Sequence, residues 1–350
     1  MQKSKKYIWN IAFMIVLFVA TFYVLLKDQD LPAIADKLWE TDQRQMGFAM
    51  IAAILYLVLQ SVSLVVILRS LGMRMKLLPS LKYSFIGFLF NAITPSASGG
   101  QPMQVLYMNM DGINMGISTV ALLFWTIIYK VALLIMEGGV LLWKHDFLVQ
   151  ALGKYQWLFW LGILVNAVSI VLYAVIVFSK NGARWIVRLV TWLLHKLRIV
   201  RRKERALRKL DVLLESYQEG AVYMRTHLGT AGIVLVITLL QRLSYFMVAW
   251  FVVCALGVTG AGMPDIIILQ SFVSVCIDIL PFPGGVGVNE SFFVVLFQPF
   301  VGRKDAFSAM LLSRGANFYG LLVISALITV GAQMYHMWRG DVSRDKNKKV

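Results

Sequence analysis

Long apolar stretches separated by short polar segments dominate the chain from end to end. Six of these stretches are continuous, and each is about as long as the 20 or so apolar residues that a helix needs to cross a bilayer. They cover residues 8–26, 47–68, 117–142, 157–179, 229–256 and 306–338. We therefore predict an all-α polytopic membrane protein with six full spans, forming one integral membrane domain over residues 1–350.

Two further apolar stretches, 83–110 and 264–302, are interrupted in the middle by proline and glycine. The interruptions contain Pro95, Gly99 and Gly100 in the first stretch, and Pro281, Pro283, Gly284, Gly285 and Gly287 in the second. Proline removes a backbone donor and glycine releases the backbone, so a continuous helix is not expected across either run. Each stretch should form two short helices that either cross the membrane or enter it and return.

The distribution of basic residues favours the second arrangement. Lys3, Lys5 and Lys6 place the N-terminus in the cytoplasm by the positive-inside rule. Segment 180–228, which holds twelve Lys or Arg and four acidic residues, is cytoplasmic only if 83–110 is re-entrant. The same rule makes 264–302 re-entrant from the opposite side and places the C-terminus in the cytoplasm. The alternative is that both breaks are kinks in long tilted helices.

The two predicted hairpins divide the chain into halves of inverted topology, 45–145 and 229–338, each with a broken stretch between two full spans. In transporters, discontinuous helices of inverted repeats meet near the membrane midplane and form the substrate site. A half-helix that begins at such a break directs its amide groups and positive dipole end inward, which favours an anion such as a lipid phosphate.

Ionisable residues inside apolar spans are the main candidates for that site, because each costs several kcal/mol unless it is paired or hydrated. The cations are Lys130, Arg242 and Arg314, and the acids are Glu137, Asp278 and Glu290. Neutral candidates near the breaks are Ser96, Ser98, Gln101, Gln104 and Asn289, and Asn317 and Tyr319 follow Arg314. These residues could bind a lipid headgroup; alternatively, the charged ones are ion pairs that brace the hairpins.

Charge and composition restrict the function further. The net charge is +16 and 59% of the residues are hydrophobic, which indicates basic loops on an anionic leaflet rather than nucleic-acid binding. Residues 182–220 mix tryptophan and leucine with arginine and lysine, and we expect an interfacial helix or topological anchor there. No nucleotide, metal or catalytic-triad spacing is present, so we expect no cofactor or metal and no catalytic residues. Membrane lipids are the expected partners.

Three segments resemble a known family. Asn91–Pro102 and Pro281–Glu290 resemble the two signature loops of the lysylphosphatidylglycerol synthase transmembrane (flippase-like) family, the membrane region of the multiple peptide resistance factor. Arg314–Tyr319 resembles it as well, and the similarity extends from about 45 to 335. The resemblance implies movement of aminoacylated or other phospholipids between leaflets of the cell membrane, with resistance to cationic peptide antibiotics. Relatives often carry an arginine soon after the first Gly-Gly pair, near the position of Gln104.

Three functions are consistent with these features. The leading hypothesis is a flippase for an anionic or aminoacylated phospholipid, or for a polyprenyl phosphate. The second is phosphatidylglycerol lysyltransferase, although the similar synthases use a large cytosolic domain that we expect this chain to lack. The third is a channel, since paired re-entrant half-helices also build water and ion pores. Six ionisable residues within apolar segments favour a lipid substrate over a water pore.

Overall fold

The computed structural model describes residues 38–94, 97–179, 227–277 and 287–347, with residues 36, 181, 182, 185 and 285 in addition. Every regular element in these ranges is helical. The predicted first span, 8–26, and most of the predicted interfacial helix, 182–220, lie outside the described residues. So do six of the candidate residues and break positions, Pro95, Ser96, Asp278, Pro281, Pro283 and Gly284.

Five described helical segments are long and apolar enough to cross a membrane, and they correspond to five of the six predicted spans. They are α3 (Gln43–Ser70), α6 (Met115–Trp143), α7 with α8 (His145–Leu152 and Gln156–Phe178), α11 (Leu228–Ala255), and α14 continuing into α15 (Arg303–Arg314 and Leu321–Asn347). The part of the chain that the structure describes is therefore all-helical, with several candidate spans.

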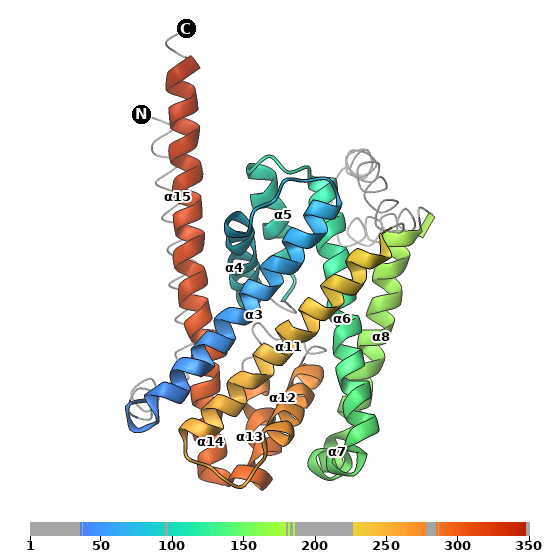
Figure 1. Ribbon diagram of the computed structural model, residues 1–350, viewed down its shortest axis with the longest axis vertical. Helices are drawn as coiled ribbons and strands as arrows, with labels where there is room; N and C mark the ends of the chain where they lie inside the picture. The colour runs from blue at the N-terminus through green and yellow to red at the C-terminus, as the bar shows by residue number, and fades with distance from the viewer. Residues whose placement is uncertain are drawn as a thin grey trace, which may run out of the picture.

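Each broken stretch forms a pair of shorter helices. The first consists of α4 (Leu77–Ile93) and α5 (Gly100–Met110), and the second of α12 (Met263–Ile277) and α13 (Val288–Val301). Figure 1 shows α4 and α5 in the upper half of the view and α12 and α13 in the lower half. The two pairs thus occupy opposite ends of the bundle.

The helices α3 and α11 form the central seam of the molecule, and they run diagonally side by side (Figure 1). Small side chains on α3, Ala49, Ala52 and Ala53, are buried in the same core as Val248 and Val252 of α11. Small residues allow helix backbones to approach closely, which is how helices associate in a membrane without a hydrophobic driving force. Ser244 on α11 adds a hydrogen bond of 2.6 Å to the Ala52 carbonyl.

The outer helix α8 has the surface expected of a lipid-facing span. Leu164, Val168 and Val171 expose about 60% of their surface, so this face is apolar without being covered by protein. Trp157 and Trp160 are exposed near the beginning of the helix. Tryptophan is enriched at membrane–water interfaces, so this end of α8 fits an interfacial position.

The last predicted span is not a uniform α-helix. A π-helical turn, η4 (Gly315–Gly320), lies between α14 and α15 and directly follows Arg314. An inserted π turn widens the helix locally and is frequent at functional sites. It changes which face of the helix the following residues occupy, compared with an unbroken α-helix.

A close contact between the helices of the first pair occurs where α5 begins. A Cβ atom added to Gly100 would lie 2.5 Å from the Gly87 carbonyl oxygen of α4 and would also overlap the Asn91 side chain. Backbone atoms cannot move aside as a flexible side chain can. Glycine is therefore required at position 100 for α4 and α5 to pack as they do.

We predict that Gly100→Ala destabilises the protein by about 1–3 kcal/mol, the usual penalty for overpacking a tight contact. The matched control is Gly139→Ala in α6, where an added Cβ would meet no atom within 4 Å. Thermal unfolding of both purified variants in detergent should show a lower Tm for Gly100→Ala only. Equal Tm values for the two variants would contradict the packing argument.

Candidate functional site

A cavity of about 370 Å³ lies between the two halves of the bundle. Six predicted site residues line it together with Gly285 of the second break, namely Gln101, Lys130, Arg242, Asn289, Arg314 and Asn317. They come from α5, α6, α11, α13, the end of α14, the π turn and the second break. Charged residues that are far apart in the sequence therefore share one space inside an otherwise apolar bundle.

Arg314 is held by an acidic residue at the start of α13. Its Nε donates to Glu290 Oε1 over 2.8 Å, and both side chains are buried. The second carboxylate oxygen, Glu290 Oε2, accepts the backbone N–H of Gly287 over 2.6 Å. The guanidinium also stacks over the Phe318 ring, with 3.9 Å between Cζ and the ring centroid. Glu290 thus fixes the arginine at the cavity wall and caps its own helix.

Arg242 is held by aromatic rings. It is only 2% exposed, and its Nη1 donates to the hydroxyl of Tyr129 on α6. Its Cζ lies 4.7 Å from the centroid of the Tyr129 ring and 5.1 Å from that of Phe246. Cation–π contacts of this kind strengthen when the site excludes water. The rings therefore stabilise a buried positive charge at the cavity.

Lys130 reaches across to the lipid-facing helix. Its Nζ donates to Oδ1 of Asn166 on α8 over 2.7 Å, and Asn166 itself is almost fully buried. The Asn166 amide in turn donates to the Gly162 carbonyl one turn earlier. This second hydrogen bond fixes the orientation of the amide, so its oxygen faces the lysine.

Polar groups on the wall add hydrogen-bonding capacity. Trp125 Nε1, Gln270 Oε1 and Asn317 Oδ1 are buried, and none of them has a hydrogen-bond partner among the described residues. All three residues line the cavity. A buried polar atom without a partner costs roughly 1–3 kcal/mol. A ligand or water in the cavity could satisfy these atoms.

The backbone amides at the starts of the half-helices are used within the chain. The N–H of Gly99 donates to Thr94 Oγ1 over 2.8 Å, and that of Gly100 donates to Asn91 Oδ1 over 2.9 Å. Both acceptors belong to the end of α4. The sequence suggested such amides as phosphate donors, but these two are already satisfied. These two amides are therefore not available to a ligand in the cavity.

Several predicted residues lie elsewhere. Gln104 is buried beneath α4, where its amide donates to the Tyr83 carbonyl over 3.0 Å and packs against Gly87. Glu137 is fully buried in α6 and is not among the lining residues. Tyr319 also lies off the wall, with its ring centroid 5.8 Å from Arg314 Cζ. Their positions around the helix axes direct them into helix contacts.

The sequence reasoning missed the aromatic part of the wall. The described aromatic lining residues are Tyr56, Phe88, Trp125, Tyr129, Tyr173, Tyr245 and Phe318. An aromatic residue within an apolar span looks like ordinary core or lipid-facing surface, so little distinguished most of these positions. Two signals were present: Tyr129 directly precedes a charged residue in the same span, and Phe318 lies within the Arg314–Tyr319 segment that resembles the family.

The fold and the cavity define an all-helical, multi-pass membrane protein with a cationic and aromatic chamber between two broken helices. The sequence model of the family described as the lysylphosphatidylglycerol synthase TM region matches residues 9–325. The chain belongs to this family, as the resemblance of its two loops predicted. A comparison with curated proteins gave no match.

We predict that Glu290 and Arg314 are energetically coupled by roughly 2 kcal/mol, as expected for residues in one buried ion pair. Glu290→Gln alone leaves the arginine without its carboxylate, and Arg314→Gln alone leaves the carboxylate without its arginine, so each should destabilise the protein strongly. The double variant should cost much less than the sum of the two. Chemical denaturation of all four proteins in mixed micelles measures the cycle, and strictly additive effects would contradict the coupling.

Proposed function

We propose that the protein moves a phosphate-bearing lipid between the leaflets of the cell membrane. The substrate is an anionic or aminoacylated phospholipid, or a polyprenyl phosphate, and the shared phosphate is the group bound in the cavity. One observation carries the proposal: Lys130, Arg242 and Arg314, from three different spans, line the same cavity. A cation within a membrane span is expensive, so three around one space favour an anionic ligand.

The other lining groups suit a lipid headgroup. Aromatic rings and neutral amides surround the cations, and the volume of about 370 Å³ falls within the range of small-molecule sites. The headgroup would occupy this polar space while the acyl chains remain in the bilayer beside apolar faces such as that of α8. The passage of water through a pore does not require three cationic side chains on its wall.

The Arg314–Glu290 pair provides a way to bind and release a phosphate. When no lipid is present, the carboxylate neutralises the arginine, so the buried cation is never left alone. An entering phosphate can take the place of the carboxylate, and the carboxylate can later displace the phosphate. Binding is then an exchange between two anions, which keeps it from becoming too tight for release.

An inverted repeat with re-entrant half-helices is part of this proposal. The α4–α5 and α12–α13 pairs lie at opposite ends of the bundle (Figure 1). Matched contacts support the repeat: Gln101 in the first turn of α5 bonds Thr126, the twelfth residue of α6, over 2.6 Å. Glu290 in the first turn of α13 bonds Arg314, the twelfth residue of α14. The predicted cytoplasmic location of both termini fits the same arrangement.

We predict that Lys130→Gln and Arg242→Gln each lower the rate of lipid movement about tenfold, the effect of losing about 1.4 kcal/mol of binding. The control is Lys154→Gln, which neutralises an exposed lysine that is not among the cavity's lining residues. The measurement is a leaflet-resolved assay with fluorescent phosphatidylglycerol in liposomes. Unfolding temperatures of the same samples separate loss of transport from loss of structure.

Two assays test the other functions against this proposal. Purified protein should show no lysyl-tRNA-dependent lysylation of phosphatidylglycerol, and turnover in that assay would overturn the transport proposal in favour of an enzyme. Liposomes that contain the protein should also show lipid movement without rapid water or ion flux. Flux without lipid movement would identify a channel instead.

A further inference from the structure

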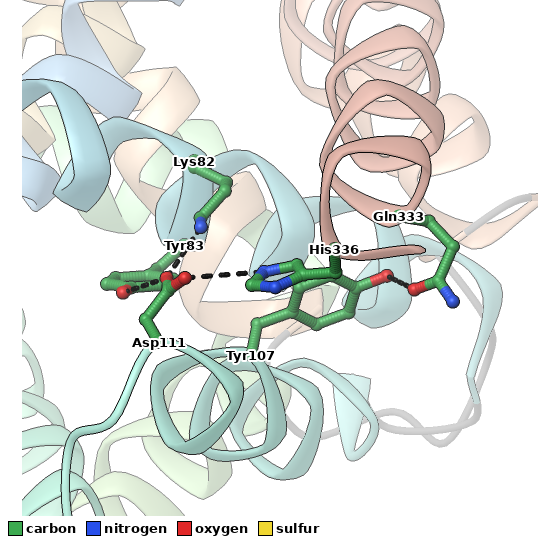
Figure 2. Close-up of polar contacts among 6 residues, drawn as sticks. All are labelled: Lys82, Tyr83, Tyr107, Asp111, Gln333 and His336. Carbon is green, nitrogen blue, oxygen red and sulfur yellow. Dashed lines mark hydrogen bonds and ion pairs between the residues drawn. The ribbon is translucent and has the colours of Figure 1, made fainter. Parts of the chain in front are cut away.

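A second polar cluster lies outside the cavity, around the carboxylate of Asp111 at the end of α5 (Figure 2). Asp111 Oδ2 accepts from Lys82 Nζ over 2.5 Å and from the Tyr83 hydroxyl, both on α4. The other oxygen, Oδ1, lies 3.3 Å from Nε2 of His336 on α15. The Asp111 carboxylate therefore contacts side chains of two helices, α4 and α15, that are distant in the sequence.

The cluster joins the two halves of the molecule. Lys82, Tyr83 and Asp111 belong to the first half, and His336 belongs to the second. Beside it, the Tyr107 hydroxyl donates to Gln333 Oε1 over 3.0 Å, which is a neutral contact between the same two helices, α5 and α15 (Figure 2). None of these residues lines the cavity. The contacts therefore hold α15 against the α4–α5 pair independently of any ligand there.

Histidine is the residue type in this cluster whose charge ordinarily changes between pH 5 and 8. The described titratable and charged groups that face His336 are Lys82 and Tyr83 on α4, Tyr107 on α5, Asp111 after it, and Tyr335 on its own helix. The histidine is therefore the group of this cluster through which pH is expected to act.

Protonation changes the strength of the contact between α15 and Asp111. A protonated imidazole forms a charge-assisted ion pair with the carboxylate, and such bonds are roughly twice as strong as neutral ones. A neutral imidazole offers at most a weaker hydrogen bond, or a repelling lone pair in the other tautomer. The His336 side chain is 8% exposed and that of Asp111 18%, so solvent screens the pair only weakly.

We propose that Asp111 and His336 form a proton-binding site at the contact between the two halves, separate from the lipid cavity. Proton binding strengthens the contact between α15 and the end of α5, and proton release weakens this contact. The site thereby makes the opening of this end of the bundle depend on pH. Its consequence for lipid movement rests on the proposed function, whereas the fastening itself does not.

Spin labels on α5 and α15 test the fastening directly. Cysteines replacing Met110 and Met334, both exposed, carry the labels in a Cys254→Ala, Cys276→Ala background. In liposomes, the fraction of molecules with the two helices apart should rise about fivefold between pH 5.5 and pH 8.0, the effect of about 1 kcal/mol. His336→Gln and Asp111→Asn should each abolish this pH response.

Tyr107→Phe is the matched control, because it removes the neutral contact to Gln333 and leaves the Asp111 cluster in place. This variant should retain the full pH response even if it shifts the population at both pH values. A label separation that is independent of pH in the parent protein would overturn the proposal. A pH response that survives in His336→Gln would overturn it as well, and this variant keeps the carboxylate, so the test does not depend on Asp111→Asn folding.

The leaflet-resolved assay then tests the link to transport. The rate of the parent protein should rise about fivefold from pH 5.5 to pH 8.0 in parallel with the label separation, and that of His336→Gln should stay constant. A pH-independent rate in the parent protein would overturn the link. If no variant moves lipid while the label separation still responds to pH, the proposed function fails and the proton site is confirmed.

Discussion

Holding positive charge inside an apolar helical bundle is the constraint on which the rest of this structure depends. Each cation of the cavity is bound by a group from another helix. Arg314 is paired with Glu290, Arg242 lies over the ring of Tyr129, and Lys130 donates to an amide on α8. Because a buried charge without such a group would destabilise the fold strongly, these contacts fix where α6, α8, α11, α13 and α14 can lie. The cavity exists where those requirements meet.

The helix breaks solve a related problem, which is how irregular backbone survives within an apolar bundle. Side chains at the end of α4 accept the hydrogen bonds of Gly99 and Gly100, and Glu290 accepts that of Gly287. These three amides thereby have partners within the protein, which is how irregular backbone is tolerated inside an apolar bundle. Close packing of Gly100 on α4 then sets the position of α5 and of Gln101 at the cavity. Local backbone chemistry and the shape of the site are therefore linked.

Two kinds of contact hold the halves together, and they differ in how easily they can change. The α3–α11 seam consists largely of small apolar side chains, whose packing is non-directional and has no charge to alter. The contacts of α15 with α4 and α5 include, besides apolar packing, a polar cluster around Asp111, whose partners carry protons. The apolar α3–α11 contacts do not depend on charge and suit a permanent joint between the halves. The contacts around Asp111 can change when one of its partners gains or loses a proton. The two types lie in different parts of the bundle.

The sequence by itself determined the membrane class, the family, the five spans that the structure describes and the two pairs of short helices, because length, apolar content and proline–glycine runs are local properties. It also singled out Lys130, Arg242 and Arg314, since charge within an apolar span is conspicuous without any structure. Only the tertiary structure decided that these three share one cavity and that Gln104 packs beneath α4 instead. The sequence also did not indicate the aromatic wall of the cavity, or that Asn166 is the hydrogen-bond partner of Lys130. The reason is that the direction of a side chain around its helix, and what it meets there, is set by packing between segments far apart in the chain.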